Sequence, residues 1–230
     1  MLHKTRGIVV NYIRYRENSV IVKIYTEAFG LQSYIVNGVR SSKAKTNRIA
    51  LFQPLTLLDL VVYHRQDHTL HRISEAKCRY PFRSLPFEIG KSSIAIFISE
   101  IMYKTLREEE NNSPLFDFLE DAILFLENAT ENVADFHLLF LSKYAFYLGF
   151  GAQSASEMLN QLRDARFVAL PDAIGQSILN DCINAPFGAN LNVDRQRRNE
   201  IVETLVYFYK IHVENFGEIK SLAVLREVLA

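Results

Sequence analysis

Residues 30–48, GLQSYIVNGVRSSKAKTNR, join a strand pattern to a segment that carries four cations and no acid. Residues 31–36 alternate between two faces, which is the period of a half-buried β-strand, and Asn37-Gly38 ends the strand. The cations that follow are Arg40, Lys43, Lys45 and Arg48. Such a segment cannot bury a core, and its like charges repel one another unless an anion neutralises them. An isolated basic loop is more often solvated surface, but strands rich in Tyr and Arg surround this one on both sides, which favours a binding role.

Strand patterns lie on either side of this stretch. TRGIVVNYIRY at residues 5–15 and SVIVKIYT at residues 19–26 precede it, and LTLLDLVVY at residues 55–63 and LHRISEAKCR at residues 70–79 follow it. No strong helical period interrupts them. Five short strands in about eighty residues predict a small closed or partly closed barrel, and the five-stranded OB-fold is the best match.

The pattern becomes helical after residue 80. Residues 87–110, 113–128 and 135–148 each carry apolar residues at helical spacing, and two more helices are expected to begin near residues 192–194 and at residue 221. Residues 150–192 are the least regular part, with a short helix expected at 156–164. The sequence therefore predicts an α+β protein, with an OB-fold nucleic-acid-binding domain at residues 1–80 and an all-α domain at residues 81–230.

The formal net charge of zero hides an asymmetry. Residues 1–80 carry 13 Lys and Arg against 5 Asp and Glu, whereas residues 81–230 carry 13 against 21. Such a division suggests a basic module that meets a polyanion, joined to an acidic module that does not.

The cellular setting follows from weaker signals. No signal-peptide pattern opens the chain, and the apolar runs are too short to span a bilayer, so we expect a cytoplasmic protein without a membrane partner. The two cysteines, Cys78 and Cys182, are far apart, which argues against a disulfide framework and fits a reducing compartment.

The candidate DNA contacts are cations and aromatic residues of the first eighty residues or so. OB-folds bind single strands by combining a positive groove with aromatic faces for stacking. Some aromatic residues at alternating positions must face outward, and those available are Tyr12, Tyr15, Tyr25, Phe29 and Tyr34. The predicted DNA-binding residues are Arg14, Arg16, Lys23, Tyr34, Arg40, Lys43, Lys45 and Arg48.

Signals for catalysis are absent. The sequence has no phosphate-binding loop and no nucleophile elbow. His64, His68 and His71 have a spacing that could bring three imidazoles together beside Asp67, but histidines in a basic hairpin more often add polar surface near phosphate. We therefore predict no catalytic residue, no metal, no cofactor and no enzymatic activity.

Several short pieces occur in a characteristic order. The chain opens with RGIVV, YRENS and YT-x-x-x-G, and these are followed by VNGVRSSK, LFQPL and L-x-RISEA. Near the end lies Y-x-x-HVENFG-x-IKSL-x-VL. This order resembles the RecO family of DNA repair and recombination proteins. The resemblance implies binding of single- and double-stranded DNA, annealing of complementary strands, contact with the single-stranded-DNA-binding protein, and loading of RecA together with RecR.

The resemblance also assigns residues. The family's G-x-R-x-x-K stretch falls on Gly38, Arg40 and Lys43, and its basic positions at the end of the first strand fall on Arg14 and Arg16. Lys45 and Arg48 extend the stretch.

One departure from the family concerns zinc. Many members carry a four-cysteine zinc site in the region that corresponds to residues 150–190, but only Cys182 lies there, so that site cannot form. Apolar contacts are expected to hold the segment instead, and the candidates are Phe167, Leu170, Leu179 and Phe187.

A second basic cluster and two other functions stay open. Arg195, Arg197 and Arg198 are either a docking site for an acidic tail or simply a solvated helix start. An OB face alone does not distinguish RNA from DNA, so an RNA-binding or ribosome-associated protein is an alternative. A protein–protein adaptor, whose basic loop meets an acidic partner, is another.

Overall fold

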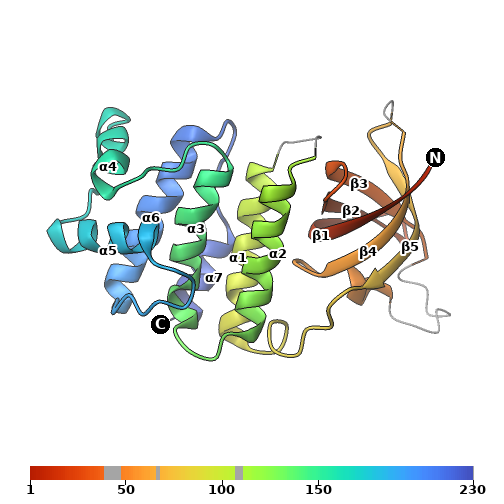
Figure 1. The fold of residues 1–230 in the computed structure, drawn as a ribbon, viewed down its shortest axis with the longest axis horizontal. Helices are drawn as coiled ribbons and strands as arrows, with labels where there is room; N and C mark the ends of the chain where they lie inside the picture. Colours follow the sequence, from red (N-terminus) through yellow and green to blue (C-terminus); the bar gives the residue numbers. More distant parts are fainter. Residues whose placement is uncertain (39–47, 66–67, 107–110, 230) are drawn as a thin grey trace. The chain divides into compact units, whose positions relative to one another are not determined.

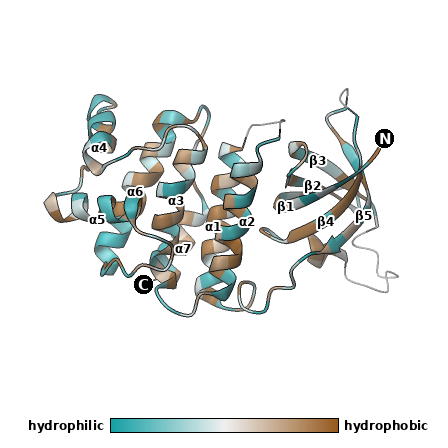
Figure 2. Cartoon of the chain, viewed as in Figure 1, coloured by the Kyte–Doolittle hydropathy of each residue, from teal (hydrophilic) through white to brown (hydrophobic). Residues whose placement is uncertain are grey.

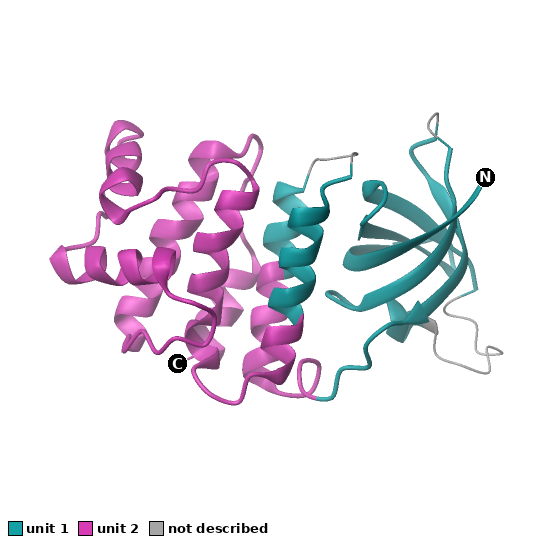
Figure 3. Ribbon diagram, viewed as in Figure 1, with its two compact units in different colours: residues 1–83, 99–123 teal, residues 84–98, 124–230 magenta. Residues whose placement is uncertain are grey.

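The computed structural model describes residues 1–38, 48–65, 68–106 and 111–229, and Figure 1 shows their fold. They form two compact units, coloured in Figure 3: Met1–Arg83 with Ser99–Ile123, and Ser84–Ile98 with Leu124–Ala230. Residue 80 separates strands from helices along the chain, as the sequence predicts. It does not separate the two compact units, because residues 99–123 belong with the strands.

The strands of the first unit close into the predicted five-stranded barrel. They are β1 (Leu2–Tyr15), β2 (Ser19–Thr26), β3 (Gly30–Val36), β4 (Leu57–Tyr63) and β5 (His71–Cys78), with a short 3₁₀ helix, η1 (Arg48–Phe52), before β4. The order around the barrel is β1-β2-β3-β5-β4, and only β3 and β5 run parallel. Figure 2 shows the hydrophobic colour that covers most of β4, and its residues Leu58, Leu60 and Val62 belong to the barrel core.

A bulge in β1 changes which of its side chains face the barrel interior. The register with β2 shifts between Val9 and Asn11, and both Val9 and Tyr12 pack in the barrel core. Regular alternation along residues 5–15 would place these two residues on opposite faces, and the bulge brings both to the interior because it inserts one extra residue. Val10 is also buried, and its carbonyl accepts a hydrogen bond from the Ser99 hydroxyl.

Two helices begin the α-helical part of the chain. They are α1 (Ile89–Thr105) and α2 (Ser113–Asn128). Asn112 caps α2, since its side-chain oxygen accepts a hydrogen bond from the Leu115 amide at 3.1 Å. In the first unit the ring of Phe116 on α2 stacks on Tyr25 of the barrel, with centroids 6.1 Å apart.

The second unit is helical. Besides a short 3₁₀ turn, η2 (Val133–Asp135), it contains α3 (Phe136–Tyr147), α4 (Ala155–Asp164), α5 (Ala173–Asn184), α6 (Arg195–His212) and α7 (Ser221–Val228). Nine of the twelve residues of α3 are buried, so α3 is a core helix of this unit. Among the described residues, no helix is long and apolar enough to cross a bilayer.

Helix α5 was not predicted. Its buried residues Ile178, Leu179, Cys182 and Ile183 do have helical spacing, but the Gly, Gln, Ser and Asn residues mixed with them hid the pattern. The Asp172 carboxylate caps it by accepting a hydrogen bond from the Gly175 amide at 2.9 Å. The same capping geometry, with Asp194 and the Arg197 amide at 2.8 Å, begins α6 where the sequence placed a cap.

Apolar contacts hold the segment around α4 and α5, as expected for a chain without the four-cysteine site. Leu179 and Cys182 are fully buried. The ring of Phe187 stacks on Phe136 with centroids 5.1 Å apart, and Phe167 stacks on Tyr207 at 4.4 Å. Burial raises the pKa of the Cys182 thiol, which keeps it protonated.

Candidate nucleic-acid interface

Strand pairing determines which side chains point out of the barrel. Val22 on β2 lies opposite Tyr34 on β3, and both are buried inside. Because side chains alternate along a strand, Ile21 and Lys23 point outward. Three rows of outward residues cross these strands. The first runs from β1 through β2 to β3 as Ile13–Ile21–Ile35 and continues to Arg72 on β5. The second is Asn11–Lys23–Ser33 on the same three strands, and the third is Tyr15–Ser19 on β1 and β2. We call this surface the outer face, and we call Ile13, Ile21 and Ile35 the isoleucine row.

Of the predicted cations of β1 and β2, Lys23 lies on the outer face, whereas Arg14 pairs with the core residue Val20 and therefore belongs to an inward row at the end of the barrel. Arg14 and Arg16 are exposed at the turn between the two strands, and Lys23 is half-buried. Arg16 has a left-handed backbone (φ 54°), and its guanidinium carbon lies 5.2 Å from the centre of the Tyr15 ring. The turn therefore presents cationic groups next to an aromatic ring at one end of the barrel.

Most of the basic stretch lies outside the described residues. This holds for Arg40, Lys43 and Lys45, and the side chain of Arg48 is likewise not described. The start of the stretch is described: the Ser19 hydroxyl donates a hydrogen bond to Asn37 Oδ1 at 2.9 Å. Residues 37–38 thus leave the barrel beside the turn that carries Arg16.

Tyr34 was a predicted DNA contact, and that prediction is wrong. Its side chain has no exposed surface and lies in the barrel core, where burial raises its pKa. Tyr25 is also fully buried, because Phe116 of α2 covers it. Tyr15 is the outward tyrosine of β1, as its pairing with Ser19 places it in the third row of the outer face.

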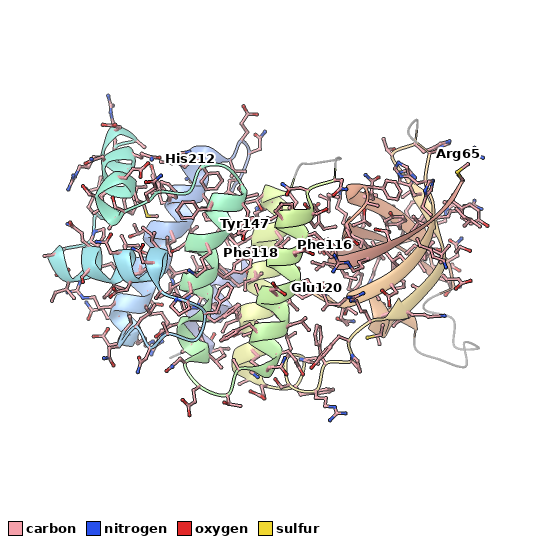
Figure 4. The ribbon with its side chains drawn as sticks, in the orientation of Figure 1. Arg65, Phe116, Phe118, Glu120, Tyr147 and His212 are labelled. Carbon is pink, nitrogen blue, oxygen red and sulfur yellow. The ribbon has the colours of Figure 1, made fainter. Side chains whose placement is uncertain are left out.

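Other barrel arginines are neutralised within the protein. Arg6 donates to Glu27 through Nε and Nη2 at 2.8 and 2.7 Å. It also reaches Glu120 at 2.5 Å and Asp117 at 2.9 Å on α2, so the pKa of its guanidinium is raised, chiefly by Glu27. Arg79 lies 3.1 Å from Glu120. Figure 4 shows Glu120 and Phe116 on α2, the helix that these contacts tie to the barrel. Nothing in the sequence marked Arg6 for this role.

The cations on the outer face and at the adjoining end of the barrel differ from Arg6 and Arg79, because they have no carboxylate partner in the part of the chain that the structure describes. Within the described ranges, no carboxylate forms an ion pair with Arg14, Arg16, Lys23 or Arg72. Unpaired positive charge on a solvated surface is available to phosphate groups. The structure therefore separates cations that stabilise the fold from cations that can bind an external anion.

A groove elsewhere on the barrel has mixed charge. Its volume is about 480 Å³, and it lies over β1, β4 and β5. Its charged lining residues are Lys4, Arg6, Glu27, Asp59, Glu75 and Lys77. Since three carboxylates balance the three cations, this groove is a poorer match to a polyanion than the outer face.

The histidines of the β4–β5 turn form a ring stack. His64 lies 4.0 Å from Phe29 and 4.7 Å from His71, centroid to centroid. Burial lowers the pKa of both histidines, so they are not the exposed cationic groups that the sequence suggested; His68 alone of the three is exposed. Among the residues whose placement is described, no group of three His, Cys, Asp or Glu could hold a metal ion.

The predicted docking cluster of α6 is largely engaged in ion pairs. Arg197 pairs with Asp172 and Glu200, both at 2.7 Å. Arg198 pairs with Asp135 at 2.8 Å and also donates to two backbone carbonyls. Arg195 is exposed and the other two arginines are half-buried, so an acidic tail docking on this cluster would have to compete with these ion pairs.

Comparison with known proteins agrees with the fold. Residues 1–82 match the family described as "Recombination protein O N terminal", and residues 86–186 match "Recombination protein O C terminal". A protein of Flavobacterium psychrophilum named "DNA repair protein RecO" is 37% identical, and the match covers 99% of each chain. Proteins of the same name from Phocaeicola vulgatus and Bacteroides fragilis are each 35% identical, over 100% and 99% of both chains. The chain therefore belongs to the RecO family.

Proposed function

We propose that the protein binds DNA through the outer face, the exposed cations at the adjoining end of the barrel and the basic stretch, and that it anneals complementary strands during recombinational DNA repair. Together with RecR and the single-stranded-DNA-binding protein, it helps load RecA onto the DNA. The observation that carries the DNA-binding step is the presence, in the described part of the barrel, of exposed cations without carboxylate partners at Arg14 and Arg16. The relatives named for DNA repair support the same process.

Annealing follows from electrostatics. Two complementary strands repel each other through their phosphates, and a basic surface that neutralises phosphates on both lowers that barrier. Each neutralised phosphate releases condensed counterions, so affinity falls steeply with salt. Contacts to phosphate carry no sequence information, so little sequence preference is expected. No covalent bond is made or broken in this process.

The assignment of partner proteins is based on family membership alone. RecR and the single-stranded-DNA-binding protein are proposed because the chain belongs to the RecO family, with a match to one relative over 99% of its length. Size-exclusion chromatography of the purified proteins, mixed in pairs, tests each contact. Absence of co-elution at low salt with either protein would contradict that part of the proposal.

The DNA-binding step is tested by fluorescence anisotropy with a labelled single strand over a salt series. We compare the wild type with the triple variant Arg14→Ala, Arg16→Ala and Lys23→Ala. Each lost phosphate contact on a single strand reduces the slope of log affinity against log salt by about 0.7, so the triple variant should lose about 2 from the slope. Adding the complementary strand, labelled with a second dye, then measures annealing.

A matched control removes the same charge elsewhere. Arg163, Arg195 and Lys210 are exposed cations of the helical unit, and their triple alanine variant should keep the wild-type slope. Equal slopes for all three proteins would contradict the assignment of the outer face. Competition by RNA of the same sequence separates DNA binding from the RNA-binding alternative, since equal competition would favour the latter.

A further inference from the structure

We infer that the isoleucine row contacts unpaired bases and makes the outer face selective for single-stranded over double-stranded DNA. The inference rests on the proposed function and identifies residues that determine strand selectivity. Neither their residue type nor the sequence alternation alone pointed to Ile13, Ile21 and Ile35 as ligand contacts.

The row is a continuous apolar strip on a solvated surface. Ile13 lies opposite Ile21 and Ile21 opposite Ile35, so the three side chains adjoin across three hydrogen-bonded strands. Ile13 is 55% exposed, and the other two are half-buried. With Arg72 opposite Ile35 on β5, the row crosses three inter-strand spacings, or about 14 Å. That length suits a few nucleotides laid across the strands.

Cations surround the strip. Arg72 ends it, Lys23 lies two residues from Ile21 on the same face of β2, and Arg16 lies beyond the end of β1 with its guanidinium over Tyr15. An apolar strip surrounded by cations without carboxylate partners among the described residues matches a ligand that has an anionic backbone and exposed apolar ring faces. A single-stranded nucleic acid has this character, whereas an apolar protein segment would leave the cations unpaired.

The isoleucine row distinguishes single-stranded from double-stranded DNA by whether the base faces are accessible. In a duplex the base faces are stacked and the edges are paired, so only phosphates and groove edges reach a protein surface. In a single strand the bases can turn out and lay their faces on apolar or aromatic side chains. Both DNAs can therefore use the cations, but only the single strand can use the isoleucine row and Tyr15.

The test uses the variant Ile13→Thr with Ile35→Thr, which keeps β-branched side chains and removes apolar surface without changing charge. Anisotropy is measured at one salt concentration with three labelled probes of equal length: a single strand, a duplex, and a single strand whose bases are removed to leave abasic sites. The wild type should bind the abasic strand about tenfold more weakly than the intact strand. The variant should bind the intact strand about tenfold more weakly than the wild type does. Its affinity for the duplex and for the abasic strand should be unchanged.

Two further variants make the result specific. Ile96→Thr with Ile174→Thr alters isoleucines of the helical unit that are 52% and 61% exposed, and all three affinities should stay at the wild-type level. Ile13→Tyr adds a stacking surface, so the intact single strand alone should bind more tightly.

Opposite outcomes overturn the inference. If the Ile13 and Ile35 variant lost affinity equally for all three probes, or for none, the row would not contact bases. Failure of the wild type to bind any probe at low salt would instead overturn the proposed function, and the inference with it.

Discussion

His137 on α3 should make the stability of the helical unit depend on pH. Its side chain is buried, and the edge of its ring meets Phe97 at 6.0 Å with the planes nearly perpendicular. Burial, with a smaller contribution from the nearby Arg198 charge, lowers its pKa from 6.5 to about 3. The folded protein thus holds His137 neutral, whereas the unfolded chain protonates it near pH 6.5.

The sign and size follow from linkage. Because the folded pKa is depressed, the stability from neutral His137 is fully present above pH 6.5 and is lost as pH falls toward 3. Protonation of the unfolded chain between pH 6.5 and 5 lowers the free energy of unfolding by about 2 kcal/mol, and the full loss below pH 3 approaches about 5 kcal/mol. The variant His137→Leu removes this dependence, whatever its stability at neutral pH.

Urea denaturation followed by circular dichroism and tyrosine fluorescence measures the effect, since the chain has no tryptophan. Wild type and His137→Leu are compared at pH 8, 6.5, 5.5 and 5. The histidines His64, His71 and His212 also have lowered pKa values, so both proteins should weaken with acid. The difference between the two proteins isolates His137, and parallel pH curves would refute the reasoning.

Three other predictions concern the barrel. Arg6→Met leaves the surrounding carboxylates without their cation and should lower the free energy of unfolding by about 3 kcal/mol. The control Arg14→Met, at an exposed position, should change that free energy by no more than about 0.5 kcal/mol. Similar urea midpoints for the two variants would contradict the ion-pair account. Tyr34→Phe should leave single-strand affinity in the anisotropy assay unchanged because the ring is inside the barrel, while Tyr15→Ala should weaken it several-fold. Gly7→Ala should cost about 1–3 kcal/mol in urea denaturation, since a Cβ there would come within 2.7 Å of two core side chains, and a wild-type midpoint would show that the core can relax.

Local patterns in the sequence were enough for the element types. Period-two alternation predicted the five strands, and apolar residues at helical spacing predicted α2, α3 and α6, because these signals depend on residues close together in the chain. Charge counts likewise located the basic module in residues 1–80. Helix α5 was missed because Gly, Ser and Asn residues, typical of loops, interrupt its apolar positions, and its stability comes from the burial of side chains such as Leu179 and Cys182.

Tertiary structure alone decided which side chains are available to a ligand. Tyr34 and Tyr15 look alike in the sequence, but strand pairing places one in the core and the other on the outer face. Arg6 and Arg14 are likewise both barrel arginines, yet Arg6 finds its carboxylates 21, 111 and 114 residues away. Burial and charge neutralisation depend on such distant contacts, and local sequence does not carry them. The sequence by itself therefore determined a basic barrel followed by a helical region. The closed fold determined which cations and apolar side chains of the barrel face the solvent.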